Sequence, residues 1–274
     1  MFSKAARAAA VLAVLATSVS ACSNDDDAKA SDDARIVIGV SDARPGLSAE
    51  KADGSFSGFD VDMASYVARR LGWSDRQVTF RALPDDDREQ ALSTGEVDMV
   101  VSAYTITTER AKAVDFAGPY LVAGQDLLVA RKSEISGPRS LNGKTVCGTR
   151  GSAELARVQE AEFSRRAVLK GADDIAACVD LLLAGRVDAV TTDDAVLAGF
   201  AKKHATRLRL VGSPFSTDYY GIGLPQGSPD VAVVNDILQR AIDDGTWQAS
   251  FDRHLGASGF AAPLPPVPSG TRAR

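Results

Sequence analysis

The chain is poor in the residues that build metal and redox centres. Its 274 residues include only two histidines, His204 and His254, and three cysteines, and it has no C-x-x-C motif. A structural zinc ion needs four closely spaced Cys or His ligands, which this composition can hardly provide. We therefore expect neither a metal ion nor another cofactor.

Positive charge is scarce relative to negative charge. The chain has 31 Lys and Arg against 36 Asp and Glu, a net charge of −5. Residues 1–21 contain two basic and no acidic residues, so their removal would leave a net charge of −7. A chain this acidic is repelled by phosphate backbones. Nucleic-acid binding is therefore disfavoured.

Long apolar runs are missing beyond the N-terminus. Residues 8–17 are mostly apolar and follow Lys4 and Arg7, but this stretch is too short to cross a bilayer and is typical of a secretory signal peptide. It leads to V-S-A-C at residues 19–22, which resembles the lipobox of bacterial lipoproteins. We expect a signal peptide over residues 1–21, lipid on Cys22, and an acidic tether over residues 22–34 that holds the folded part at the outer face of the cell membrane. The alternative is an ordinary cleavage site with a chance cysteine.

If Cys22 carries lipid, Cys147 and Cys178 remain as a pair. Extracellular compartments are oxidising, and an even number of cysteines there favours a disulfide. The alternative is two independently buried thiols.

A short pattern, L-x-x-G-x-V-D-x-V, occurs at residues 92–100 and again at residues 182–190. Each copy indicates a helix end, a glycine stop and a short buried strand, so the chain is predicted to contain two similar lobes. Ligands of open α/β sheets lie beyond the carboxyl ends of strands. The first copy is followed there by hydroxyls and Arg110, and the second by Asp193. That pairing of charges suits a zwitterion.

The pattern of apolar residues divides the chain into two lobes with two crossings between them. Residues 35–121 and 222–260 are predicted to form lobe 1, and residues 122–221 lobe 2 with the hinge strands. The crossings are expected near residues 120–125 and 216–221, and a double crossing permits closure around a ligand. The predicted helices are residues 59–71, 88–93, 152–163, 173–184, 229–243 and 246–255. The tail, residues 261–274, contains four prolines and is predicted to be disordered.

Several longer motifs resemble one known family. They are T-I-T-T-E-R at 105–110 followed by V-D-F-A-G-P-Y at 114–120, G-F-D-V-D at 58–62, S-L-N-G-K at 140–144 and V-D-A-V-T-T-D-D at 187–194. In this order they resemble the extracellular solute-binding proteins of amino-acid ABC transporters, over roughly residues 35–260, and most of all the glutamate-binding lipoproteins of actinobacteria. The resemblance implies an α/β, two-lobe, type II periplasmic-binding-protein-like fold with a two-strand hinge. It also implies a monomer that delivers an amino acid to the permease subunits of an ABC transporter.

The resemblance assigns a ligand-binding role to individual residues. Arg110 matches the arginine that binds the ligand's α-carboxylate, and a guanidinium suits this task because it offers two parallel N–H donors. Thr105, beside Tyr104, matches a neighbouring hydroxyl, and Asp193 matches the acid that accepts the α-ammonium group. Ser152 starts a predicted helix and is expected to donate to the same anion. The alternatives are a surface ion pair for Arg110 and a simple N-cap for Ser152.

A glutamate ligand carries a second carboxylate, which requires a further cation. Arg88 stands where glutamate-binding relatives have an arginine, but Asp85, Asp86 and Asp87 precede it and could hold it in a structural ion pair. Arg44 and Arg150 are the other candidates. Arg150 and Ala153 stand where such relatives tend to have threonines, which weakens the assignment of glutamate.

Two other function classes share this frame. Cyclohexadienyl dehydratases resemble the family and use the same cleft, with Glu109 or Asp85 as a candidate acid, but the sequence offers no set of nucleophile, base and orienting group. A ligand-sensing module that feeds a separate receptor is the third possibility. We expect a binding protein and not an enzyme.

Overall fold

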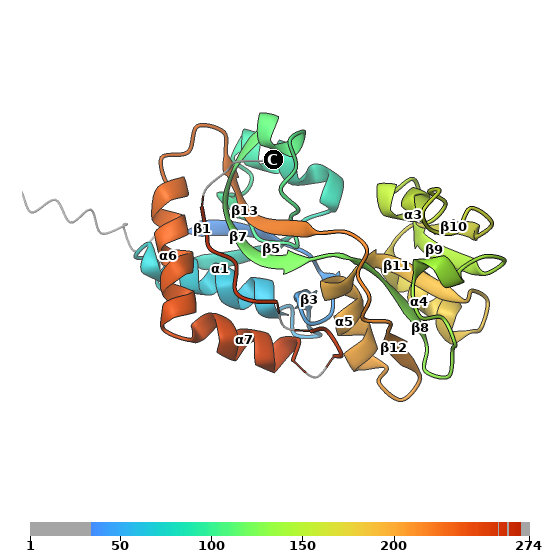
Figure 1. The fold of residues 1–274 in the computed structure, drawn as a ribbon. Coiled ribbons are helices and arrows are strands. Elements are labelled where there is room, and N and C mark those ends of the chain that lie inside the picture. Colours follow the sequence, from blue (N-terminus) through green and yellow to red (C-terminus); the bar gives the residue numbers. More distant parts are fainter. Residues whose placement is uncertain (1–33, 257, 262, 270–274) are drawn as a thin grey trace, which may run out of the picture.

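The computed structural model describes residues 34–256, 258–261 and 263–269, which form two α/β lobes lying side by side (Figure 1). Each lobe is built on a five-stranded sheet. The expected signal peptide, the lipid site Cys22 and nearly all of the tether lie outside the described residues. Among the described residues, none of the helices combines the length and the apolar character that a bilayer crossing requires.

The sheet of lobe 1 contains strands from both ends of the chain. Its order is β5 (Val78–Ala82), β1 (Ile36–Val40), β6 (Met99–Val100), β13 (Asp218–Pro225) and β7 (Val114–Ala123). The strands β5, β1 and β6 are parallel, and β13 is antiparallel to its neighbours. A small antiparallel sheet beside it consists of β2 (Ala43–Arg44), β3 (Ser48–Glu50) and β4 (Phe56–Ser57).

The sheet of lobe 2 repeats this arrangement. Its order is β10 (Val168–Ala172), β9 (Thr145–Thr149), β11 (Ala189–Asp193), β8 (Gln125–Ala130) and β12 (Leu208–Leu210). The strands β10, β9 and β11 are parallel, and β8 is antiparallel to both of its neighbours.

The sequence repeat has the same structural role in both lobes. Gly95 and Gly185 follow α2 (Arg88–Thr94) and α4 (Ile175–Leu183) with φ of 72° and 68°, values that glycine adopts without strain. The aspartate of each repeat then binds the backbone of the adjacent parallel strand, because Asp98 accepts from the Val37 amide and Asp188 from the Thr145 amide, each at 2.7 Å. The prediction of two similar lobes is confirmed.

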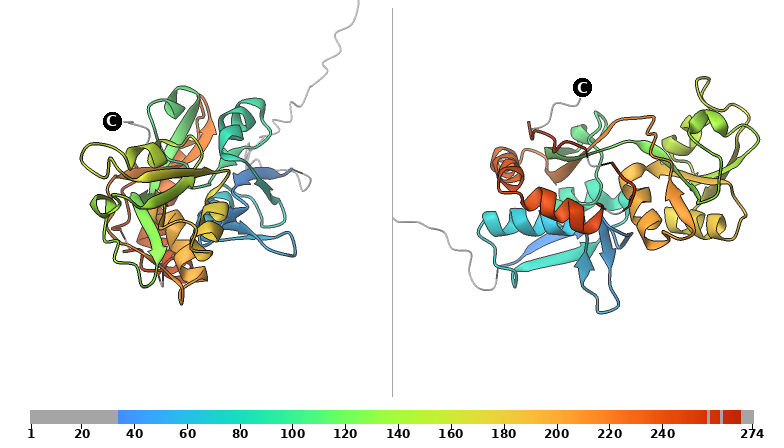
Figure 2. Two further views of the ribbon diagram at one scale, coloured as in Figure 1. Left: turned by 90° about the vertical axis from the view of Figure 1, so that its right-hand side faces the viewer. Right: turned by 60° about the horizontal axis from the view of Figure 1, so that its bottom comes forward.

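The helices of lobe 1 are α1 (Phe59–Arg70), α2 (Arg88–Thr94), α6 (Val231–Asp243) and α7 (Thr246–His254), with short 3₁₀ turns η1 (Asp85–Asp87) and η2 (Arg110–Lys112). Helices α1, α6 and α7 lie together over one face of the sheet (Figure 2). Phe59 packs against Trp247 and Phe251, and the Trp247 indole donates to the Tyr120 carbonyl at 2.7 Å. The C-terminal helices therefore complete lobe 1.

The helices of lobe 2 are α3 (Ala153–Arg157), α4 (Ile175–Leu183) and α5 (Asp194–Lys203), with one 3₁₀ turn η3 (Pro138–Ser140). The predicted helix at 152–163 is wrong in length, because α3 ends at Arg157. Tertiary contacts draw the following residues away from the helix axis, since Phe163 packs edge-on against Phe215 and the Ser164 hydroxyl donates to the Pro138 carbonyl. Helix α5 was not predicted.

Two chain segments join the lobes (Figure 1). Strand β7 of lobe 1 runs through Gly124 into β8 of lobe 2, and the chain returns through residues 212–217 into β13. The segments hold each other, because the Gln125 amide donates to Ser216 Oγ at 2.7 Å and the Phe215 amide to the Gln125 carbonyl at 2.8 Å. The arrangement is the predicted two-strand hinge.

Helix α5 of lobe 2 also touches lobe 1 directly. A Cβ atom added at Gly199 would lie 1.5 Å from the Pro45 carbonyl oxygen, so the helix and the loop after β2 approach more closely than any side chain would allow. The ammonium group of Lys202, one turn further on, donates to the carbonyls of Arg253 and His254 at the end of α7.

The C-terminal tail is described to residue 269. Residues 263–269 lie along lobe 1, where Pro266 is buried and the Ser269 amide donates to the Gly118 carbonyl at 3.0 Å. This part of the tail has a defined path, in contrast to the disorder predicted from its prolines.

Candidate functional site

Three arginines converge on the face of lobe 1 that is turned toward lobe 2. Arg44 comes from β2, Arg88 starts α2, and Arg110 starts η2. The guanidinium carbon of Arg88 lies 5.0 Å from the centre of the Tyr104 ring, and that of Arg110 lies 5.2 Å from it. The sequence candidates Arg44, Arg88, Arg110, Tyr104 and Thr105 therefore belong to one cluster.

Arg44 and Arg88 share two partners, the backbone at Ser102 and the carboxylate of Asp85. Their guanidinium groups donate to the Ser102 carbonyl at 3.0 and 2.8 Å. Asp85 Oδ2 is ion-paired with Arg44 and Oδ1 with Arg88. The sequence left open whether Arg88 forms an ion pair with its acidic neighbours, and the structure contains this ion pair with Asp85.

The two arginines differ in exposure. The Arg88 side chain is 2% exposed and that of Arg44 is 18% exposed. Burial lowers the pKa of Arg88 to about 10, and the charge of Arg44 adds to this effect. Arg88 Nε is buried and has no hydrogen-bond partner among the residues that the structure describes, an arrangement that normally costs free energy.

Arg110 is the most exposed of the three, at 34% of its side chain. It donates to the Thr105 carbonyl at 2.9 Å, and its Nε lies 3.7 Å from a carboxylate oxygen of Glu89. Tyr104 is fully buried and donates its hydroxyl to the same Glu89 oxygen at 2.7 Å. Glu89 thereby orients both the ring and the guanidinium group.

The loop that carries these groups is held from beneath by Asp60. Its carboxylate accepts from the Ala103 amide at 2.9 Å and from the Tyr120 hydroxyl at 2.8 Å. Ala103 has a φ of 46°, a conformation that L-residues adopt only at a cost. The buried carboxylate compensates for this strain and fixes the backbone between Ser102 and Tyr104.

Lobe 2 presents a carboxylate to this cluster. Asp193 ends β11, is 9% exposed, and accepts a hydrogen bond from the Tyr220 hydroxyl on hinge strand β13. Burial raises the pKa of Asp193 to about 7; Asp218 and Glu154 add to the rise, while Tyr220 and Arg44 oppose it. Asp193 is thus electrostatically coupled to a guanidinium of the other lobe.

The two remaining candidates of lobe 2 lie outside the buried cluster. Arg150 is 69% exposed and pairs with Asp173 at 3.3 Å. Ser152 is half-buried and caps α3, since its hydroxyl accepts from the Leu155 amide at 3.2 Å. The N-cap reading of Ser152 is confirmed.

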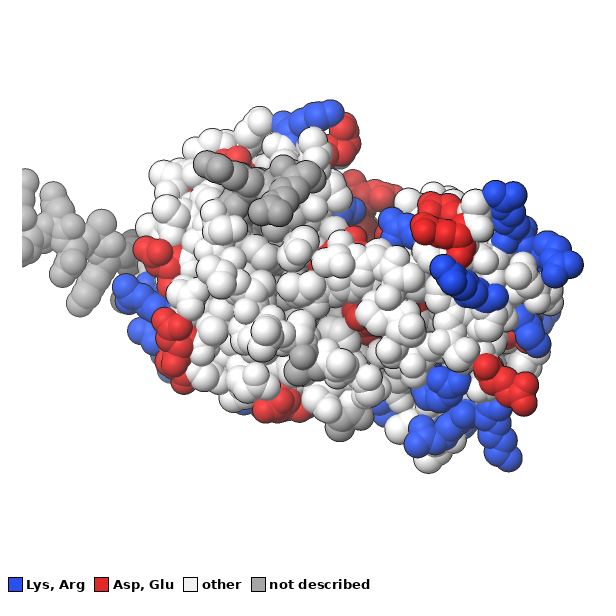
Figure 3. Space-filling view, in the orientation of Figure 1, with Lys and Arg blue, Asp and Glu red and all other residues white. Residues whose placement is uncertain are grey.

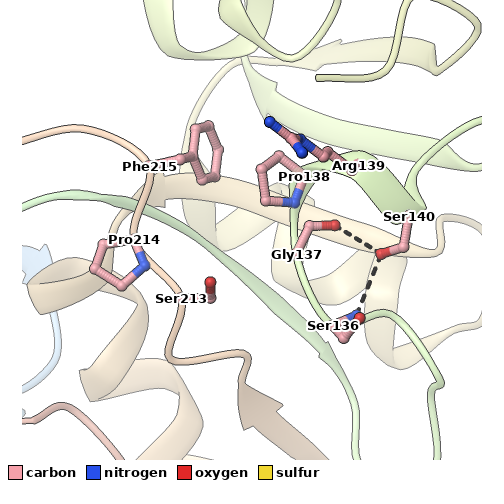
Figure 4. Close-up of a pocket in the computed structure, with 8 residues that line it drawn as sticks. All are labelled: Ser136, Gly137, Pro138, Arg139, Ser140, Ser213, Pro214 and Phe215. Atoms are coloured by element: carbon pink, nitrogen blue, oxygen red, sulfur yellow. Dashed lines mark hydrogen bonds between the residues drawn. The ribbon is translucent and has the colours of Figure 1, made fainter. Parts of the chain in front are cut away.

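The surface is hollowed between the lobes, and charged side chains of both signs lie around that hollow (Figure 3). A second pocket lies within lobe 2, between the η3 turn and the segment that leads to the hinge, and is lined by Ser136, Gly137, Pro138, Arg139, Ser140, Ser213, Pro214 and Phe215 (Figure 4). It has one charged side chain, Arg139, and so does not oppose charges of different sign as the interlobe cleft does. Within the described part of the chain, no three His, Cys, Asp or Glu side chains are grouped to hold a metal ion.

The sequence between residues 36 and 257 matches the family model described as bacterial extracellular solute-binding proteins, family 3. The chain belongs to this family. Its two sheets and double hinge are therefore the type II binding-protein fold that the motifs predicted.

Individual relatives and solved structures are similar to most of the chain. The glutamate-binding protein GluB of Corynebacterium efficiens is 32% identical over 93% of this chain and 92% of its own. An ancestral arginine-binding protein solved with bound glutamine is 31% identical, covers 81% of this chain and 98% of its own, and superposes with a TM-score of 0.69. An ancestral amino-acid-binding protein, a precursor of cyclohexadienyl dehydratase, is 29% identical, covers 81% of this chain and 95% of its own, and also superposes with a TM-score of 0.69.

Three contributors to the site were not singled out from the sequence: Ser102, Glu89 and Tyr220. Ser102 could have been found, because it lies two residues after the end of β6 and the carboxyl ends of strands are where α/β proteins bind ligands. Tyr220 gives no local signal, since it reaches Asp193 only through the return of the chain to lobe 1.

Proposed function

We propose that the protein binds an amino acid between its lobes and delivers it to the permease of an ABC transporter. Arg110 would bind the α-carboxylate, with Thr105 beside it, and Asp193 would accept the α-ammonium group. One observation carries this proposal: a partly exposed guanidinium cluster on lobe 1 faces the buried carboxylate of Asp193 on lobe 2. A zwitterion neutralises both charges when it lies between them.

We propose glutamate, or a close analogue, as the ligand. Arg44 and Arg88 together carry two positive charges, and Asp85 compensates one of them. The remaining charge suits a side-chain carboxylate, because a buried anion needs a nearby cation. Arg44 is the more exposed partner, so it is better placed than Arg88 to touch the ligand, and Arg88 would act from behind it. The glutamate-binding relative supports this choice.

Calorimetric titration of the refolded, ligand-stripped protein against the twenty amino acids tests the proposal. Glutamate is expected to bind most tightly. Tight binding of a neutral or cationic amino acid without binding of glutamate would remove the specificity claim and leave amino-acid capture standing. Failure to bind any amino acid would remove both.

A dehydratase on the same fold is the competing function, because one of the similar solved structures is a precursor of cyclohexadienyl dehydratase. Such an enzyme needs an acid aimed at a leaving hydroxyl. The candidate acids are occupied, because Asp85 pairs with two arginines and Glu109 with Lys112, where it is 84% exposed. We therefore propose that the protein performs no bond chemistry.

Binding is expected to weaken as the pH falls. In the free protein the pKa of Asp193 is about 7, and an ammonium partner stabilises the ionised form, so binding below this pH must release a proton. Affinity for an amino acid with a neutral side chain should fall by up to about tenfold per unit below about pH 7. Titrations at several pH values measure this.

The sign is opposite for the stability of the free protein. A folded-state pKa raised from 3.8 to about 7 means that the folded state binds the extra proton. This group's contribution to the free energy of unfolding is therefore present at low pH and is lost as the pH rises from about 4 to about 7. Asp193→Asn should remove the dependence of affinity and the share of Asp193 in the dependence of stability, while Asp194, whose pKa burial also raises to about 7, keeps its own share. An affinity for neutral amino acids that stays constant across this range would contradict the prediction.

We propose that the protein is a monomer, held at the outer face of the membrane by lipid on Cys22. A diacylglyceryl group provides two acyl chains, which retain a protein where a single chain does not. Cys22→Ala should release the protein into the medium or stop its processing, as membrane fractionation and labelling with a radioactive fatty acid would show. Membrane retention of the variant equal to that of the wild type, together with an unlabelled wild type, would refute the anchor.

A further inference from the structure

Asp85 has a position that neither the family match nor the α-amino-acid contacts explain. It starts η1, directly after Pro84, and its side chain is 51% exposed, although it pairs with an arginine that is only 2% exposed. Its two oxygens are divided between Arg44 and Arg88. A carboxylate that bridges two guanidinium groups resembles in charge and shape the side-chain end of an acidic ligand.

The arginines do not depend on Asp85 for their positions. Each donates to the Ser102 carbonyl and also to Ser102 Oγ, at 3.1 Å from Arg44 and 3.2 Å from Arg88. Arg88 is held further by the face of the Tyr104 ring. Asp85 therefore supplies charge to a pair of cations that the backbone already fixes.

We propose that Asp85 is a resident counter-anion that determines ligand specificity, an inference that rests on the proposed amino-acid site. It neutralises one of two guanidinium charges and leaves one for the ligand. A ligand carboxylate that approaches Arg44 must share the pair with Asp85 and is repelled by it, whereas a neutral side chain is indifferent to it. Asp85 thus lowers the preference for glutamate over glutamine below what two free arginines would give.

Asp85→Asn tests this, because it removes the charge and keeps the shape. The ratio of glutamate to glutamine affinity should rise at least about tenfold, the size of one lost charge repulsion at close range. Asp86→Asn and Asp87→Asn are matched controls, since both residues are exposed, lie in the same 3₁₀ turn, and change the net charge by the same amount. Their ratios should stay close to that of the wild type. The double variant Arg44→Gln with Asp85→Asn restores a single positive charge and should return the ratio toward the wild-type value.

A second readout needs no amino acid. In Asp85→Asn the arginine pair lacks its anion, so sodium chloride should raise the melting temperature of this variant more than those of the wild type and of Asp86→Asn. Equal weakening of both amino acids, or an unchanged ratio with an unchanged salt response, would overturn the assignment. Glutamate binding that appears only in Asp85→Asn would support the assignment while removing glutamate as the natural ligand.

Discussion

Arg110→Ala is expected to reduce affinity for every amino-acid ligand by about 2 to 5 kcal/mol, because it leaves the ligand's buried carboxylate without its charged partner. Asp193→Asn should reduce affinity by a similar amount, since an amide cannot compensate the α-ammonium charge. The asparagine still accepts the Tyr220 hydrogen bond, so the fold is preserved. Calorimetry with the tightest ligand found for the wild type measures both losses.

The chain offers a matched control for the arginine. Arg150→Ala deletes the same group at an exposed position, where the guanidinium forms an ion pair with Asp173. Exposed ion pairs contribute little, and Arg150 lies outside the cluster around Tyr104, so its loss should change affinity less than about threefold. If Arg110→Ala and Asp193→Asn bind as the wild type does and melt cooperatively, the ligand lies elsewhere.

Removal of the Cys147–Cys178 disulfide should cost the protein roughly 3 to 4 kcal/mol in the free energy of unfolding. The structure joins these residues, which are 31 positions apart and both fully buried, and so ties α4 to β9 within lobe 2. In the chain-entropy model, a cross-link of this span restricts the unfolded chain by that amount. Urea unfolding of the Cys147→Ala, Cys178→Ala double variant against the wild type gives the value.

Reducing agent separates the cross-link from the loss of two sulfur atoms. It should destabilise the wild type and leave the double variant unchanged. Two thiols that alkylate in the unfolded, unreduced wild-type protein would show that the bond does not form.

Local patterns were sufficient to predict most of the frame. Glycine stops and a repeated aspartate are short-range signals, and the structure confirms them at Asp98 and Asp188, each on the first amides of a neighbouring strand. Elements whose ends depend on distant contacts were not predictable in this way. Helix α3 ends at Arg157, before the segment in which Phe163 packs against Phe215, 52 positions further along the sequence. Helix α5 has a glycine at its centre, which weakens its local signal.

The candidate site also combines features that local patterns predict with features that depend on distant contacts. Arg44, Arg88 and Arg110 are cations near turns or strand ends, so residue type and the family resemblance could nominate them. Arg88 and Arg110 meet at the Tyr104 ring, and Arg44 and Arg88 meet at the Ser102 carbonyl. These contacts depend on the folding of three separate segments. Which cation would be buried depended on the same folding, and the structure makes Arg88 the inner and Arg44 the outer member of the pair. The family resemblance alone points to Arg88, the inner of the two, as the specificity residue.

The contact between Gly199 and Pro45 connects the segments that carry two charged groups of the proposed site, Asp193 on lobe 2 and Arg44 on lobe 1. Glycine inside a helix costs roughly 0.5 to 1 kcal/mol relative to alanine, yet a methyl group at this position would collide with the Pro45 carbonyl. Asp193 stands at the N-cap of the same helix, and Arg44 immediately precedes Pro45. Helix α5 therefore has the Asp193 carboxylate at its N-terminal end, and its contact with lobe 1 lies one residue from Arg44. A rotation of lobe 2 about the contact between Gly199 and Pro45 changes the distance between the Asp193 carboxylate and the Arg44 guanidinium group while the lobes stay in contact.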